Sequence, residues 1–319
     1  DIPGVLPKSR LKMKNFRSIG LMLVFVASLL ASCTSDNVMT GSSQVENQEV
    51  VFNLFEHSIS GLETRGDESG NKALADCGLF SELELAMVPK GGTMKSAYYF
   101  RQDDSMDSFG QMKLLLPTGT YQLVIVAANT PKPINTKNRI NIKSLTEVDF
   151  PNNQVSDMAY CCQEVTVAST GKTQTIDCVL KRAVACVCLE TTDKVLANQK
   201  TFSISISGNC GNVFNPSTGH CLATAPVNKV ADVSKLTGKG LTLDIYVLLG
   251  EDDVSDVSLS TTATDTDGKE IKSTSFQNVH LVAGKRTTYK GPFFSYTNKV
   301  SVSVTEADIT DSGFSKVFE

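Results

Sequence analysis

Short runs of apolar and β-branched residues, each ended by residues such as Gly, Pro, Asn or Asp, recur along most of this chain. Residues 202–206 alternate strictly between apolar and polar side chains, and residues 241–249 are largely apolar. An alternation of period two is typical of a strand with one face in a core, and a short apolar run is typical of a fully buried strand. Ser and Thr are abundant and Trp is absent. The pattern predicts an all-β fold with little helix.

Turn signals between neighbouring runs predict hairpins. Residues 79–88 and 94–100 are separated by Pro-Lys-Gly-Gly, and residues 257–264 and 270–276 by a segment that contains Asp267-Gly268. Asp-Gly between alternating runs favours a tight hairpin turn. We expect further strands at residues 49–55, 158–167, 173–180, 183–189 and 300–304, and at most a short helix at residues 142–148.

Residues 116–121, Leu-Pro-Thr-Gly-Thr-Tyr, carry the strongest local signal of the first half, and an apolar run to Asn129 follows them. Pro fixes one backbone torsion and Gly permits a positive φ, so the chain reverses here and enters a buried strand. We expect Tyr121 to bury its ring and to satisfy its hydroxyl on nearby backbone. This arrangement recurs in β-sandwiches of the transthyretin type.

The strands fall into two groups, and each group is long enough to bury its own core. Lys181-Arg182 precedes a second apolar run at residues 183–189. We therefore expect two β-sandwiches in tandem, an N-terminal one at residues 48–180 and a C-terminal one at residues 181–319.

The segment before these sandwiches has the pattern of a bacterial lipoprotein signal. Lys14 and Arg17 precede an apolar run at residues 19–30, and small residues lead into Cys33. In such signals the Cys thiol receives a lipid and becomes the mature N-terminus, and burial of the acyl chain holds the protein on a membrane. We expect Met13 to be the initiator, residues 1–32 to be upstream sequence and signal peptide, and residues 33–47 to be a flexible tether. An ordinary secretory signal that ends beside a cysteine is the alternative.

The formal net charge of −4 is mild, and no long run of like charge occurs. Nothing in this composition indicates nucleic acid or an anionic lipid surface as a partner.

The chain has nine cysteines, and eight remain if Cys33 carries lipid. No CxxC pair occurs, and Cys186 and Cys188 alternate along an expected strand, which places both thiols on one face rather than around a metal. Most of the cysteines lie in apolar runs and are expected to be small buried hydrophobes. Cys210 and Cys221 flank a loop rich in Gly, Asn and Pro and are the candidate disulfide.

The sequence indicates no catalytic site, no metal site and no cofactor. The chain has three histidines, and none lies in an HExxH, GxSxG or Cys-Gly context. A dyad of Cys221 with His280 is therefore disfavoured. Acidic residues at 251–256 and 265–267 would suit calcium, but the EF-hand pattern is incomplete and the turn accounts for Asp267-Gly268. We expect the protein not to be an enzyme.

Arg65 lies in a Gly-punctuated, charged stretch at residues 61–71 that follows the first expected strand. Such a loop is accessible to a trypsin-like protease. Release of the first strand would expose unpaired backbone groups and an apolar slot, which a strand of another subunit could fill. Arg65-Gly66-Asp67 is also an integrin tripeptide, and we interpret it as a chance occurrence.

Taken together, these motifs resemble the fimbrillin family, the subunits of type V pili in anaerobic Gram-negative bacteria. The resemblance rests on Cys33, the first strand, Thr64-Arg65, the turn at residues 116–121 with Ala128-Asn129, and Leu180-Lys-Arg-Ala-Val-Ala185. It implies two transthyretin-like sandwiches, export as an outer-membrane lipoprotein, removal of the first strand after an Arg, and polymerisation by strand exchange. Carried over, Cys33 is the lipidation site and Arg65 the processing site.

The leading hypothesis is a lipid-anchored structural subunit of a cell-surface fimbria that assembles by strand exchange with other fimbrial subunits, as a homo- or hetero-polymer. Val51, Phe52, Leu54 and Phe55 would be the exchanged contacts. The role as stalk, anchor or tip stays open. The alternative is a surface lipoprotein that binds a glycan or another host or microbial surface ligand without polymerising. Candidate aromatic platforms for it are Tyr98-Tyr99-Phe100 and Phe293-Phe294 with Tyr296.

Overall fold

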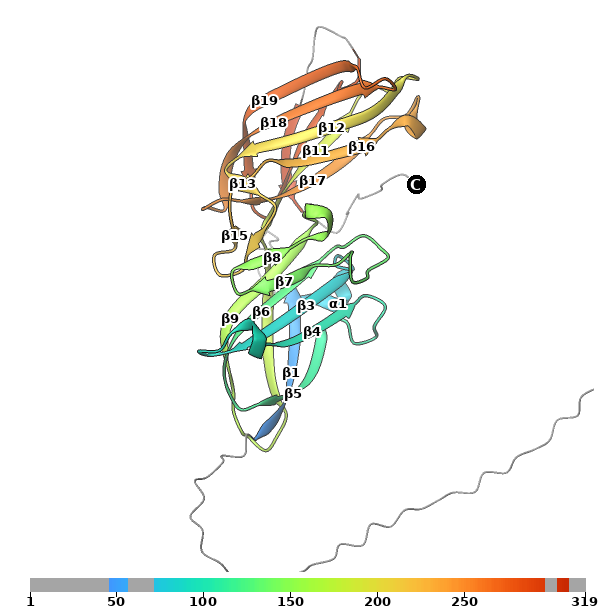
Figure 1. Ribbon diagram of the computed structural model, residues 1–319. Helices are drawn as coiled ribbons and strands as arrows, with labels where there is room; N and C mark the ends of the chain where they lie inside the picture. Colours follow the sequence, from blue (N-terminus) through green and yellow to red (C-terminus); the bar gives the residue numbers. More distant parts are fainter. Residues whose placement is uncertain (1–45, 57–71, 296–302, 310–319) are drawn as a thin grey trace, which may run out of the picture. The chain divides into compact units, whose positions relative to one another are not determined.

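The computed structural model describes residues 46–56, 72–295 and 303–309 (Figure 1). Most of these residues lie in strands and few in helices, which confirms the predicted all-β class. The helical segments among them are short: α1 (Leu74–Cys77), η1 (Met94–Ser96), η2 (Pro151–Asn153) and η3 (Ser234–Leu236). In the described part of the chain, no helix is long and apolar enough to cross a membrane.

The first half of the described chain is a β-sandwich. One layer holds β5 (Gln111–Pro117), β1 (Asn47–Glu56), β10 (Gln174–Arg182) and the short β2 (Lys72–Ala73). The other holds β9 (Met158–Val167), β6 (Gly119–Ala128), β3 (Glu82–Pro89) and β4 (Tyr98–Asp103). β9 and β10 pair at two positions, Tyr160 with Lys181 and Ala159 with Arg182, and so join the layers. A first core that draws on both layers lies between them.

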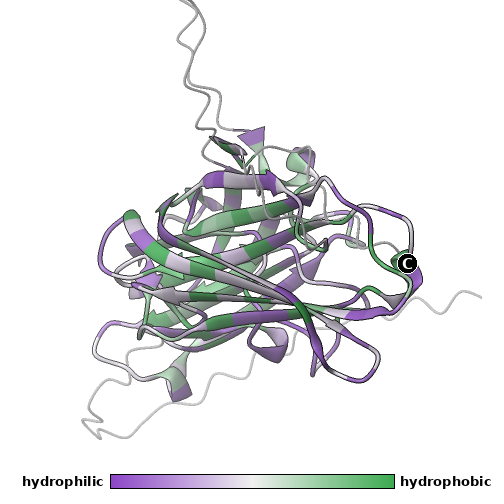
Figure 2. Cartoon of the chain, turned by 90° about the horizontal axis from the view of Figure 1, so that it is seen from above, coloured by the Kyte–Doolittle hydropathy of each residue, from purple (hydrophilic) through white to green (hydrophobic). Residues whose placement is uncertain are grey.

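The second half is also a β-sandwich. A five-stranded sheet runs in the order β13 (Cys210–Gly211), β17 (Thr242–Leu249), β11 (Val184–Thr191), β20 (Lys285–Gly291) and β21 (Ser303–Asp308). A four-stranded sheet runs in the order β16 (Val227–Asp232), β12 (Gln199–Gly208), β18 (Val254–Asp265) and β19 (Glu270–Val282). The second core lies between them. Apolar and polar residues alternate along these strands (Figure 2), because one face of each sheet is turned to the core.

The first strand is paired in the same way in both sandwiches. In each, the first strand of the half pairs in parallel with a late strand, β1 with β10 and β11 with β20, and antiparallel with a strand on its other side. A small sheet combines both halves: β7 (Asn141–Ser144) and β8 (Glu147–Asp149) with β14 (Phe214–Asn215) and β15 (His220–Cys221). A third core surrounds it. The residues from Val45 to Glu319 form one compact unit, and the domain limits of 48–180 and 181–319 stay predictions.

Several local predictions are confirmed. The hairpin of β3 with β4 and the Asp-Gly hairpin of β18 with β19 both form. Tyr121 is buried, and its hydroxyl donates a hydrogen bond to the carbonyl of Pro117 at 2.7 Å. The turn at residues 116–121 therefore works as its sequence indicates, because the ring packs in the first core while its polar tip is satisfied by the turn.

The expected short helix at residues 142–148 is wrong, because β7 and β8 form a hairpin there. Ile142 and Val148 pair across it and are buried in the third core, so tertiary packing decides the conformation. Of the strand expected at residues 300–304, residues 300–302 lie outside the described residues, and the last two belong to β21 (Ser303–Asp308). Strand β5 was not predicted, although Met112, Leu114 and Leu116 alternate with exposed residues along it.

Candidate functional site

Strand β1 is the first strand of the described chain, and it lies inside a layer rather than at its edge. It pairs in parallel with β10 from Val50 to Glu56 and antiparallel with β5 from Asn47 to Asn53. Both of its backbone edges are therefore occupied over most of its length (Figure 1). The described residues give β5 no other strand partner, so β5 is attached to the sheet through β1.

The side chains of β1 alternate between the first core and the outer face. Val50, Phe52 and Leu54 are buried at 0–1% exposure. Val51 and Phe55 lie on the opposite face and are half-buried. Of the four residues predicted as exchange contacts, the structure therefore places Phe52 and Leu54 in the core. Val50 was not in that set, although it continues the same alternation.

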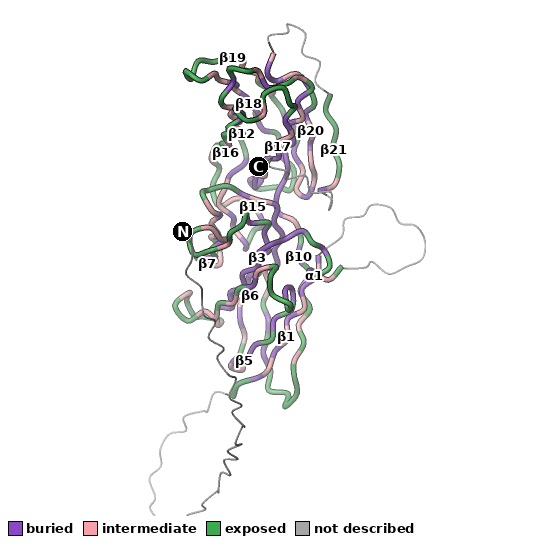
Figure 3. The backbone as a smooth tube through the Cα atoms, turned by 90° about the vertical axis from the view of Figure 1, so that its right-hand side faces the viewer, coloured by how far each residue is buried: buried purple, intermediate pink, exposed green. Residues whose placement is uncertain are grey.

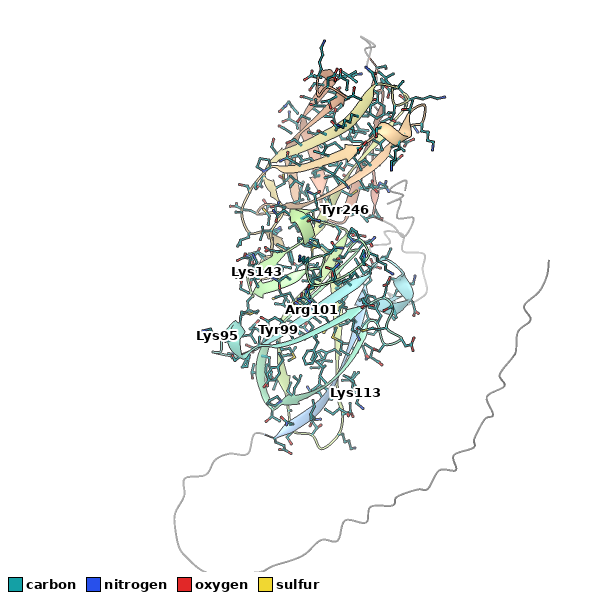
Figure 4. All side chains as sticks on the ribbon, turned by 45° about the vertical axis from the view of Figure 1, so that its right-hand side comes forward. Lys95, Tyr99, Arg101, Lys113, Lys143 and Tyr246 are labelled. Carbon is teal, nitrogen blue, oxygen red and sulfur yellow. The ribbon has the colours of Figure 1, made fainter. Side chains whose placement is uncertain are left out.

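Polar contacts fix the register of β1 at its outer face. Asn53 donates to Asp177 of β10 and accepts from Gln111 of β5, both at 2.9 Å. Glu49 pairs with Lys113 of β5 at 2.8 Å (Figure 4). Hydrogen bonding to Lys113 lowers the pKa of the exposed Glu49 carboxyl. These contacts link β1 to both neighbours, and a strand of different sequence in this position would have to replace them.

The carboxyl end of β1 reaches a buried ionic cluster around Arg182. The guanidinium of Arg182 contacts both carboxylate oxygens of Asp157, at 3.1 and 3.2 Å, and Glu56 of β1 at 3.2 Å. It also donates to the carbonyl of Ile309, the last described residue. Burial raises the pKa of Asp157, and the charge of Arg182 opposes that shift. Arg182 thus ties the first strand to the end of the described chain.

A cavity of about 530 Å³ lies beside this cluster, between the loop that carries Asp157 and strands β16 and β17. Most of its wall surface comes from apolar atoms, some of them from Leu241, and Lys229 and Tyr246 are among the residues that supply polar groups. Tyr246 is labelled in Figure 4. The Lys229 ammonium donates to the carbonyl of Asp244 at 2.8 Å, and burial lowers its pKa. Burial also raises the pKa of Tyr246.

Carboxylates beside the cavity are already paired with arginines. Asp244 binds Arg286 at 2.7 Å, and Asp157 binds Arg182. Among the described residues, Lys229 forms no ion pair within 4.0 Å, and its ammonium donates to a backbone carbonyl instead. A cavity with an apolar wall and a few polar groups is the usual form of a small-ligand site.

Most of the described cysteines are buried, as predicted: Cys77, Cys161, Cys178, Cys186, Cys188 and Cys210 are buried, and Cys162 and Cys221 are half-buried. Cys188 accepts a hydrogen bond from Arg286 at 3.1 Å. Cys210 lies in β13 and Cys221 in β15. The Cys221 sulfur is close to the backbone of β13, because a Cβ atom added at Gly211, the residue after Cys210, would lie 3.2 Å from it. The Cys210–Cys221 disulfide stays a prediction.

The remaining candidates from the sequence are placed as follows. Phe293 and Phe294 are fully buried in the second core, so they form no surface platform, whereas Tyr99 of β4 is 40% exposed. His280 is exposed, and its Nδ1 lies 3.1 Å from the carboxylate of Asp256. Asp265 accepts hydrogen bonds from the backbone of Asp267 and Lys269, which is turn chemistry. Across the described residues, no group of three or more His, Cys, Asp or Glu side chains is suited to a metal.

Cys33, Arg65, His57 and Tyr296 lie outside the described residues. Lipidation at Cys33 and processing at Arg65 therefore stay predictions.

Several solved structures share a similar arrangement of strands. They include a proposed polysaccharide-binding protein from Bacteroides thetaiotaomicron (14% identity, TM-score 0.46, 82% of this chain and 99% of that one). A proposed adhesin from Bacteroides ovatus has 10% identity, a TM-score of 0.48 and coverage of 82% and 95%. The fimbrial anchor protein Mfa2 from Porphyromonas gingivalis has 12% identity, a TM-score of 0.41 and coverage of 83% and 98%.

With TM-scores below 0.5, the likeness carries no information on function. No curated protein matches the sequence. Residues 93–312, more than half of the chain, match a family described as of unknown function, DUF6562, and the chain belongs to this family.

Proposed function

We propose that this protein is a non-enzymatic structural subunit of a cell-surface fimbria, held in the outer membrane through lipid on Cys33 and assembled by exchange of β-strands between subunits. The observation that carries the proposal is the position of β1. It is the first strand, it lies between β10 and β5, and the segment that contains Arg65 follows it in sequence. The sequence motifs shared with fimbrillins support the same assignment.

Removal of β1 would have two physical consequences. It would leave one backbone edge of β10 unpaired and would leave β5 without its strand partner, and unpaired edges are templates for another strand. It would also empty the part of the first core that Val50, Phe52 and Leu54 fill. Burial of one such side chain stabilises by roughly 1.5–3 kcal/mol. A strand with three apolar residues in alternation would therefore bind with a defined register.

The proposal is tested with the full-length mature chain and its Arg65→Ala variant. A trypsin-like protease is expected to cleave the wild type after Arg65 and to yield ladders that resist mild denaturant. The Arg65→Ala chain is expected to stay monomeric and uncut at this position. Lys137→Ala is a matched control, because it removes an exposed basic residue of another loop. Equal ladders from Arg65→Ala would contradict cleavage-gated exchange.

The membrane anchor is tested separately. The intact mass of protein extracted from native membranes is expected to show acylation of Cys33, and Cys33→Ala is expected to leave the chain in the soluble fraction. A wild-type mass without lipid would contradict the anchor and leave strand exchange untouched.

The cavity favours a second candidate function, a surface module that binds a glycan as a monomer. Lys229 and Tyr246 supply hydrogen-bond donors in a wall that also carries the amides of Asn129, Asn138 and Gln154. The test is calorimetry of the uncleaved monomer with oligosaccharides identified on a glycan array. Binding that is lost in Lys229→Met and kept in Lys137→Ala would favour this function. Absence of binding would remove it.

A further inference from the structure

Two cysteines from opposite layers of the first sandwich meet in its core. Cys161 of β9 is 8% exposed and Cys178 of β10 is fully buried, and both belong to the first core. The two thiols are near enough to perturb each other's pKa, that of Cys161 downward and that of Cys178 upward. They lie just beyond the point where β9 and β10 part, because the two strands pair at Ala159–Arg182 and Tyr160–Lys181. The contact therefore joins the layers where backbone pairing has ended.

We propose that Cys161 and Cys178 form a disulfide in the exported protein and so link the two layers of the first sandwich. A disulfide needs its two sulfurs in near contact and its Cβ atoms directed at each other, and two thiols that project into one core just beyond the last paired residues of their strands approach this arrangement. Disulfides form and persist in exported proteins, whereas cytosolic thiols stay reduced. The structure holds the reduced form, with both thiols free.

The chemistry is a thiol–disulfide exchange with an oxidant that is itself a disulfide, either a small molecule or an oxidoreductase. One thiol loses its proton, and its sulfur attacks the oxidant to give a mixed disulfide and release one thiol. The second cysteine then attacks the mixed disulfide and releases the other thiol, so two electrons and two protons leave the pair. The neighbouring Cys178 thiol lowers the pKa of Cys161, which makes Cys161 the first to react. Because the pair is buried, we place the reaction during folding.

The neighbouring cysteine shows why this pair is selected. Cys162 follows Cys161 in β9 and its side chain projects to the other face of the strand, where it packs against the third core. Because successive side chains of a strand point to opposite faces, the Cys161 side chain points toward Cys178 and the Cys162 side chain points away from it. Cys178 also accepts a weak hydrogen bond from Gln163 at 3.6 Å. These contacts hold its sulfur on the side of β9 that carries Cys161.

The link has a consequence for strand exchange, and this step rests on the proposed function. β10 pairs with β1 at seven positions and with β9 at two. Once β1 leaves, β10 keeps few backbone partners, and the slot that receives a new strand would lose one wall. A covalent bond at Cys178 holds β10 against the opposite layer and keeps that wall in place. We therefore expect the disulfide to favour exchange.

The disulfide is tested on full-length protein exported to an oxidising compartment, by peptide mapping without reduction. Trypsin separates a peptide of residues 144–172, which carries Cys161 and Cys162, from a peptide of residues 173–181, which carries Cys178. Wild type and Cys162→Ser are expected to give the linked pair of peptides, and Cys161→Ser and Cys178→Ser are expected to give them separately. Linked peptides in Cys161→Ser, or separate peptides in the wild type, would overturn the proposal.

A thermal measurement gives a second readout that needs no variant. The linked cysteines enclose a loop of fewer than twenty residues, for which oxidation is expected to raise Tm by roughly 5–10 °C over the reduced wild type. No rise in protein whose link is mapped would contradict a role in holding the layers. If protein with the mapped disulfide formed no ladders, strand exchange would be contradicted and the disulfide would not. Failure of one proposal can therefore be told from failure of the other.

Discussion

Arg182 and Asp157 form a two-point ion pair in which Nε and one terminal nitrogen of the guanidinium each contact one carboxylate oxygen, at 3.1 and 3.2 Å. Both side chains are about nine-tenths buried. A buried pair of this kind is weak support for stability in itself, because both charges lose hydration. Removal of one member, however, leaves an uncompensated charge inside the protein.

We therefore expect Arg182→Met to lower the free energy of unfolding by about 3–5 kcal/mol. Asp157 and Glu56 would both lose their partner. The measurement is urea unfolding at neutral pH. The double variant Arg182→Met/Asp157→Leu is the control and is expected to recover much of the loss. A single-variant loss below about 1 kcal/mol, the size typical of exposed pairs, would show that solvent reaches the cluster.

The pH dependence of stability follows from the buried carboxyls. Burial raises the pKa of Glu82, Glu84, Asp157 and Asp244 in the folded chain. The folded state then binds more protons than the unfolded state, whose acids titrate at about 4. Stability from these groups is present at low pH and is lost as pH rises through the raised values. The exposed Asp103 and Asp232 have lowered pKa values and act in the opposite direction below about pH 4.

We expect the free energy of unfolding to fall as pH rises above about 4, the range in which the unfolded acids have lost their protons, and to fall less steeply in Glu84→Gln, because Glu84 is fully buried. Urea unfolding at several pH values measures both slopes. Glu49→Gln is the matched control, since the pKa of this exposed residue is lowered and it should leave the slope in this window unchanged. Equal slopes in wild type and Glu84→Gln would contradict the assignment.

Phe52 is the largest core residue of β1, and its truncation tests how much this strand contributes to the first sandwich. We expect Phe52→Ala to cost about 3–5 kcal/mol, because a fully buried ring leaves a cavity. Phe55→Ala in the same strand is the control and should cost much less, since Phe55 lies half-buried on the outer face. Urea unfolding gives both values. Similar losses would mean that the outer face of β1 is covered in solution.

The alternation of apolar residues was sufficient to predict the strands that bury one face. β1, β12 and the β18–β19 hairpin follow this pattern, and Asp267-Gly268 marks the turn between β18 and β19. The position of β1 between β10 and β5 was not predictable in the same way. Parallel pairing with β10 joins residues more than 120 positions apart, and no local pattern encodes which strand becomes the neighbour.

The buried cluster around Arg182 and the Cys161–Cys178 contact were missed for a related reason. Arg182 follows a strand and resembles an exposed turn residue in sequence, and its partners Asp157 and Glu56 come from distant segments. The half-buried Val51 and Phe55 show the limit of pattern reading within one strand, because a two-residue period fixes the faces but not which face is the core. Strand β21 is exposed on most of its length (Figure 3), and no core pattern marks its extent.

Tyr121 tests the turn that opens β6. Its hydroxyl donates to the carbonyl of Pro117, so Tyr121→Phe leaves that carbonyl without this donor and is expected to cost about 1 kcal/mol. Tyr98→Phe is the matched control, because the Tyr98 ring packs against Tyr121 at 6.0 Å while its hydroxyl plays no part in the turn. Thermal unfolding followed by circular dichroism measures both. An unchanged Tm in Tyr121→Phe would mean that water replaces the hydroxyl.

The carboxylate of Asp193 accepts hydrogen bonds from the backbone of the segment that follows β20. One carboxylate oxygen accepts a hydrogen bond from the backbone of Phe293 at 2.9 Å, and the other accepts from Phe294 and Ser295 at 2.7 and 2.6 Å. These bonds position Phe294, whose ring packs edge-on against Phe202 in the second core at 5.2 Å. One side chain thereby orders three backbone groups and an aromatic contact.

Asp193→Ala is therefore expected to lower the free energy of unfolding by about 2–4 kcal/mol, because hydrogen bonds to a charged acceptor are stronger than neutral ones and three donors lose it together. Asp193→Asn keeps one acceptor oxygen and should lose less. Asp267→Ala, at an exposed turn, is the control and should change stability by less than about 0.5 kcal/mol. Urea unfolding ranks the three variants. If Asp193→Asn lost as much as Asp193→Ala, the charge rather than the number of acceptors would decide the contribution.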